Sequence, residues 1–130
     1  MAGPSDSLRN AILEHFYRGN SQTARGGTLY VSLHTADPGR TGANELTGSG
    51  YARQAVTFDP AVAGATDAVA DAVFPANSGG ASYTVSHIGL YDALTAGNFH
   101  DGGAIAGGSK AVPVGANLRI PSADLDVVGV

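Results

Sequence analysis

The sequence contains no cysteine and no tryptophan, and Lys110 is its single lysine. Without cysteine, the chain forms neither disulfides nor thiolate metal sites. Its arginines are scattered along the chain, and 11 acidic residues bring the net charge to −4. Proteins that bind nucleic acid need clustered basic residues to neutralise phosphates. We therefore expect no nucleic-acid partner.

Long hydrophobic runs are also missing. No apolar stretch approaches the roughly 20 residues that a membrane-spanning helix requires. Residues 1–6 lack the basic and apolar regions with which a signal peptide begins. These features predict a chain that is made in a cytoplasm and has no membrane partner.

Large side chains are scarce, whereas glycine is abundant. The 130 residues suit one domain, and alanine and valine supply most of the 43% hydrophobic content. Burial gains roughly 25 cal/mol per Å² of apolar surface, so small side chains contribute less each. The 19 glycines add conformational entropy that folding must overcome. Such a chain gains from burial against neighbours, which favours a component of an assembly.

Residues 1–20 predict an N-terminal helix. Leu8, Ile12 and Phe16 recur at intervals of four residues and form an apolar stripe, and Ser5 begins a capping sequence. The stripe requires burial, either on the chain's own sheet or on a partner. The sequence leaves both alternatives open.

Residues 21–130 predict short strands between glycine-rich turns. Alternation of apolar and polar residues is clearest in 28–35 and 83–92. The other candidate strands are 51–58, 67–75, 103–112, 116–121 and 123–130. No helical pattern separates them, so a parallel sheet is not expected. We predict a mainly β, single structural domain, an antiparallel β-sandwich or jelly-roll-like barrel with one N-terminal α-helix.

The residues that could support catalysis do not form a recognisable motif. Ser32, His34 and Asp37 are neighbours in sequence and lack a nucleophile-elbow pattern. We expect His34 and Asp37 instead to hydrogen-bond the loop that leaves the first strand. His87 and the pair His100-Asp101 lack the companions that a metal site needs. The sequence predicts no enzyme, no catalytic residue, no cofactor and no metal.

The polar loop 40–50 either bonds within its own chain or contacts a neighbouring subunit. Glu45 and Arg53 lie on either side of Tyr51, so a pair between them would order the loop. If the loop instead reaches a neighbouring subunit, Arg40, Glu45 and Tyr51 are its expected contacts, because arginine and tyrosine are favoured at interface centres. The alternative is a surface loop whose polar groups bond within the chain.

Five phrases of the sequence are distinctive in their order and spacing. They are YVSLHTADPG (30–39), TGANE (41–45), GYARQ (50–54), VSHIGLYDA (85–93) and LRIP (118–121). Through them the chain resembles a family of small tailed-bacteriophage virion structural proteins, whose members are labelled tail-fibre or capsid decoration proteins. The resemblance runs from Thr28 onwards and is looser in the helix. Tyr91 stands where a tryptophan is often found, and His100-Asp101 replaces a more apolar pair.

The resemblance implies a structural protein of the virion, made in the host cytoplasm, and carries no catalytic residues. Our leading hypothesis is a capsid decoration (cement) protein that binds the major capsid protein and itself, as a homotrimer or dimer. The alternative is a tail-fibre or tail-tip component that binds a host surface glycan; a tail-associated hydrolase is a third class. The candidate inter-subunit contacts are Leu8, Ile12, Phe16, Arg40, Glu45, Tyr51 and Arg53.

Overall fold

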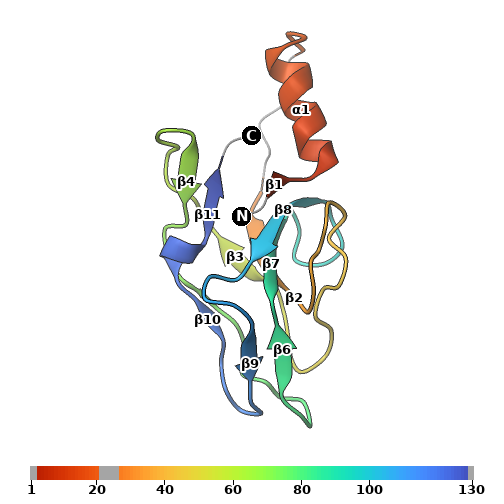
Figure 1. The fold of residues 1–130 in the computed structure, drawn as a ribbon, viewed down its shortest axis with the longest axis vertical. Coiled ribbons are helices and arrows are strands. Elements are labelled where there is room, and N and C mark those ends of the chain that lie inside the picture. The colour runs from red at the N-terminus through yellow and green to blue at the C-terminus, as the bar shows by residue number, and fades with distance from the viewer. Residues whose placement is uncertain (1–2, 21–26, 129–130) are drawn as a thin grey trace.

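The computed structural model describes residues 3–20 and 27–128 (Figure 1). The chain is mainly β, with antiparallel sheets and one α-helix near the N-terminus, which confirms the predicted class. That the sheets form a sandwich or jelly-roll-like barrel stays a prediction. The elements of the first half are β1 (Gly3–Pro4), α1 (Asp6–Phe16), β2 (Leu29–His34), β3 (Gln54–Val56), β4 (Ala65–Asp67) and β5 (Ala72–Val73). Those of the second half are β6 (Tyr83–Val85), β7 (His87–Tyr91), β8 (Phe99–Ala104), β9 (Lys110–Val112), β10 (Arg119–Ile120), a 3-10 turn (Ser122–Asp124) and β11 (Asp126–Val128).

A five-stranded antiparallel sheet lies at the centre, in the order β1-β8-β7-β2-β3. Three two-stranded ladders, β10-β5, β11-β4 and β6-β9, complete the sheets among the described residues. Apolar side chains from these strands and from the residues next to them, including Leu33, Phe74, Ile88, Ile120 and Leu125, pack into one buried core. The core therefore joins strands that are far apart in sequence.

β2 is buried on both faces. Val31 and Leu33 point into the hydrophobic core, as the alternation predicts. Ser32 and His34, on the opposite face, are also fully buried. The second buried face is polar, and the ring of His34 lies beside those of Tyr91 and Phe99. This face adjoins the candidate sites described below.

Three strands predicted as single segments are divided in the structure. Segment 83–92 splits at Ser86 into β6, which pairs with β9, and β7, which pairs with β2 and β8. Segment 67–75 contains the end of β4 and the separate β5, and segment 103–112 contains the end of β8 and all of β9. In each case the two halves pair with different strands, which local alternation does not reveal.

The predicted helix over 1–20 is shorter in the structure. α1 begins after Ser5, whose hydroxyl accepts a hydrogen bond from the amide of Leu8 at 3.2 Å, as expected of its N-cap. Gly3 and Pro4 instead form β1 at the edge of the central sheet, opposite Gly102 and Asp101 of β8. An edge position suits proline, which has no amide hydrogen to donate. Figure 1 shows α1 projecting from one end of the β structure.

Candidate interaction sites

Arg53 forms the centre of a buried polar cluster beside β3. Its Nε and Nη2 atoms donate to the two carboxylate oxygens of Glu45, each at 2.8 Å. Its Nη1 donates to the carbonyl oxygens of Ala93 and Ala96 at 2.8 and 2.7 Å. The guanidinium carbon lies 3.5 Å from the centroid of the Tyr91 ring, and the side chain of Arg53 is only 7% exposed. Arg53 thus joins the loop 40–50 to the turn that follows β7.

Tyr51 extends the same cluster to β2. Its hydroxyl donates to Oε1 of Glu45 at 2.7 Å and accepts from the amide of Leu33 at 3.1 Å. Burial alone would raise the pKa of Glu45, but the hydrogen bonds from Arg53 and Tyr51 outweigh it and hold the pKa below its usual value. Burial, together with the bond to Glu45, raises the pKa of Tyr51. At neutral pH, Glu45 is therefore the ionised acceptor and Tyr51 the protonated donor.

Ser32 and His34 form a second polar pair in contact with this loop. The Nδ1 atom of His34 lies 2.7 Å from the carbonyl oxygen of Ala43, so it carries the proton and donates. The Nε2 atom is then the acceptor for the hydroxyl of Ser32, at 2.8 Å. Burial lowers the pKa of His34, which favours this neutral tautomer.

The structure places Asp37 away from that pair. Its carboxylate accepts from the amide of Gly39 at 2.8 Å and orders the turn after β2. A catalytic triad needs a carboxylate on the histidine and a serine that substrate can reach. Here a backbone carbonyl faces His34, and Ser32 is completely buried. The expectation that His34 and Asp37 hydrogen-bond the loop leaving the first strand is confirmed.

A cleft of about 370 Å³ opens beside Arg53. Its lining combines a carboxylate, a phenol and a threonine hydroxyl with the half-exposed Leu94. The residues that line it are Glu45, Leu46, Tyr51, Ala52, Arg53, Leu94, Thr95 and Ala96. Arg53 hydrogen-bonds Glu45 on one side of the cleft and the carbonyl of Ala96 on the other. These bonds hold the two sides of the cleft together.

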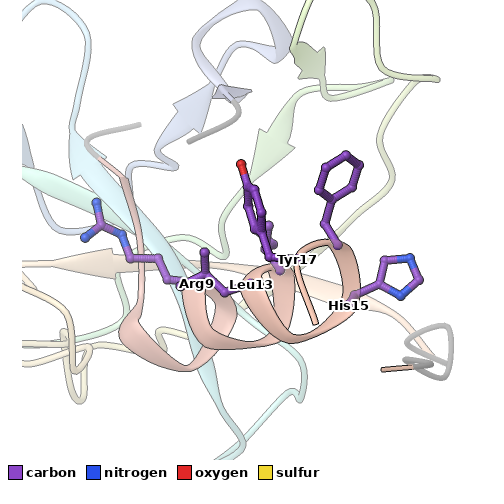
Figure 2. Close-up of a pocket in the computed structure, with 6 residues that line it drawn as sticks. Arg9, Leu13, His15 and Tyr17 are labelled. Carbon is purple, nitrogen blue, oxygen red and sulfur yellow. The ribbon is translucent and has the colours of Figure 1, made fainter. Parts of the chain in front are cut away.

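A second candidate surface is the apolar face of α1. None of the 11 residues of this helix, all within the described part of the chain, is buried. Ile12, Leu13, Phe16 and Tyr17 are 37%, 51%, 77% and 75% exposed. With Arg9 and His15 they line an open hollow of about 600 Å³. Figure 2 shows Leu13 and Tyr17 rising from the same side of the helix.

The structure gathers the predicted contact residues into two groups. Leu8, Ile12 and Phe16 lie on α1, and the structure adds Leu13 and Tyr17, which the spacing of four residues between them could have revealed. The second group, Glu45, Tyr51 and Arg53, bonds within the chain, whereas the exposed Arg40 pairs with Asp6 at 2.5 Å and links the loop to α1. That these residues contact another subunit stays a prediction.

The remaining histidines on strands have local partners. The ring of His87 hydrogen-bonds the hydroxyl of Ser86 at 2.7 Å, and His100 lies 3.2 Å from the carboxylate of Asp92. Within residues 3–20 and 27–128, no three histidine or acidic side chains come together as a metal site would require. No helix in the same ranges is long and apolar enough to cross a membrane.

Comparison with protein families shows which family the chain resembles. Residues 3–128 match the family model described as Gp80: Podophage GP4 fiber I protein gp80. The matched range includes α1, every strand and both candidate surfaces. Comparison with curated proteins finds no match.

Proposed function

Because the chain belongs to the Podophage GP4 fiber I protein gp80 family, and so to the structural proteins of tailed-phage virions, we propose that it is a non-catalytic component of the tail fibres. The family match over residues 3–128 is the observation that carries this proposal. The family description names a fibre, which favours the tail-fibre alternative over capsid decoration, the leading hypothesis from the sequence.

A structural role agrees with the way the polar groups are used. Within the described residues, every buried side-chain nitrogen or oxygen has a hydrogen-bond partner. The charges of Arg53 and Glu45 neutralise each other and order a loop, and the Ser32–His34 pair is closed to substrate. Such saturated networks fix a shape and leave few groups poised for chemistry.

The copy number per virion tests the fibre role. Purified particles would be digested, and the chain quantified by mass spectrometry against the major capsid protein and the portal protein. A fibre component attached at the tail vertex is expected in a handful to a few dozen copies, as the symmetry of the tail dictates. Hundreds of copies, in a simple ratio to the capsid protein, would contradict the fibre role and support capsid decoration.

The cleft beside Arg53 supports a finer proposal, that the fibre binds a host surface glycan there. The carboxylate of Glu45 and the hydroxyl of Thr95 suit sugar hydroxyls, and Leu94 and Tyr51 supply apolar surface. Thr95→Tyr would fill the cleft from its rim. We expect this variant to lose binding to purified host surface polysaccharide, measured by biolayer interferometry. Thr84→Tyr, at an exposed position of β6, is the matched control. Equal binding by both variants would exclude this cleft.

A further inference from the structure

α1 presents an apolar face that its own chain does not cover. An isolated helix of 11 residues is marginal in water, since most helices shorter than about 12–15 residues depend on packing for stability. Yet α1 packs chiefly on the two-residue β1, and the Asp6–Arg40 pair holds only its first turn. The stabilising contact for this face must therefore come from outside the described chain.

The face is self-complementary. Arg9, Leu13 and Phe16 are spaced by four and three residues, so they lie on the same side of the helix. The cation therefore stands at one end of the face and the aromatic rings of Phe16 and Tyr17 at the other. The backbone amide of Arg9 bonds to Ser5 within the helix, but its side chain makes no ion pair or hydrogen bond with any described residue and lies on the same side as Leu13 (Figure 2).

We propose that the occupant of this face is α1 of a second copy, packed antiparallel about a two-fold axis near Ile12 and Leu13. In that arrangement each Arg9 meets the Phe16 and Tyr17 rings of the other copy, where a cation over an aromatic face is favourable. A parallel pair would instead place one Arg9 against the other. The charge pattern of the helix thus selects the antiparallel orientation.

The exposed area suits a weak but specific contact. The apolar residues of the face together expose as much surface as more than two large side chains, roughly 500 Å² per copy; they are Ile12, Leu13, Phe16 and Tyr17. With all of this area covered in both copies, a pair would bury at most roughly 1,000 Å², which is near the lower limit for specific interfaces. We therefore expect free copies to associate weakly and copies held side by side in a virion to associate firmly. The pairing does not depend on whether the virion site is tail or capsid.

Sedimentation equilibrium of the full chain, up to about 1 mM, tests the pairing. We expect a monomer–dimer equilibrium that Phe16→Ser weakens at least about tenfold, because it removes the most exposed ring. Val114→Ser removes an exposed apolar side chain elsewhere and should leave the equilibrium unchanged. Circular dichroism confirms that both variants are folded. A monomer at every concentration, or equal dimerisation of Phe16→Ser and Val114→Ser, would overturn the proposal.

Arg9→Gln separates the two orientations by the sign of its effect. In the antiparallel pair this variant loses the cation–ring contact, so dimerisation should weaken about threefold or more. In a parallel pair it would remove repulsion between like charges and strengthen dimerisation. A stronger dimer would therefore overturn the antiparallel arrangement.

Discussion

At the scale of single residues, Arg53 determines how the loop 40–50 is held. A buried guanidinium is tolerated only when its donors are satisfied, and Arg53 meets this requirement with Glu45 and two backbone carbonyls. The proximity of Glu45 and Arg53 in the sequence made their pairing predictable. The contacts with Tyr91, Ala93 and Ala96 were not, because some 40 residues separate these partners from Arg53.

Replacement of Arg53 tests this arrangement. Arg53→Met keeps the length of the side chain but leaves the Glu45 carboxylate without its cation, so the free energy of unfolding in urea should fall by about 3 kcal/mol. Arg40→Met breaks the exposed pair with Asp6 and should cost less than about 1 kcal/mol. Adding Glu45→Gln to Arg53→Met should restore part of the loss, since it removes the unpaired charge. Equal losses from Arg53→Met and Arg40→Met would contradict the account.

His34 makes stability depend on pH. Its pKa in the folded chain lies below the unfolded value of 6.5, chiefly because of burial and also because Arg53 and His87 are near, while the Ala43 carbonyl and Glu45 act in the opposite sense. Below about pH 6.5 the unfolded state therefore binds the proton first, and stability falls as the pH drops through the folded pKa. Against the effect of burial, the pKa of Glu45 is lowered by its hydrogen bonds from Arg53 and Tyr51, and that of Asp92 is lowered to about 2, chiefly by the amide of Asn98. Both carboxylates therefore add losses of the same sign below their unfolded pKa values of 4.5 and 3.8.

Urea unfolding at pH 7.5, 6.5, 5.5 and 5.0 (roughly spanning the His34 titration) measures this dependence. The wild-type chain should lose stability across the range, and His34→Gln should show a shallower slope whatever its absolute stability. His15→Gln, at an exposed position of α1, should keep the wild-type slope. Identical slopes for His34→Gln and the wild type would show that His34 does not titrate as described.

At the scale of elements, β2, β7 and β8 depend on the absence of a side chain at Gly89. A Cβ atom there would lie 2.7 Å from Oγ of Ser32, 2.8 Å from Nε2 of His34 and 2.8 Å from the ring of Phe99. The alternation in 83–92 predicted a strand. The sequence near Gly89 does not reveal that side chains from β2 and β8 pack against this glycine. Strand partners come from the tertiary fold, as the division of that segment into β6 and β7 also demonstrates.

Gly89→Ala should therefore strain the central sheet. Because all three neighbouring side chains are closely packed, we expect a loss of about 1–3 kcal/mol in the free energy of unfolding, measured in urea. Gly80→Ala is the matched control, since nothing lies within 4 Å of its added Cβ atom. It should change stability by less than about 0.5 kcal/mol. If Gly89→Ala lowered the free energy of unfolding no more than Gly80→Ala does, the close packing around Gly89 would not limit the side chain at this position.

At the scale of the whole molecule, the chain offers an ordered β body and a projecting helix (Figure 1). In the described part of the chain, every buried side-chain nitrogen or oxygen has a hydrogen-bond partner, whereas the helix leaves its apolar face open. The sequence predicted the helix, its cap and the mainly β class, because these follow from local periodicity and turn residues. It did not predict β1, whose two residues are a strand only because β8 offers them an edge.

The location of the chain on the particle tests the central claim most directly. Purified virions would be labelled with gold-tagged antibodies against the β body and viewed by electron microscopy, with antibodies against the major capsid protein as the control. The proposed fibre role predicts gold confined to the tail vertex and its appendages. Gold spread evenly over the head would contradict it and would identify the chain as a capsid decoration protein.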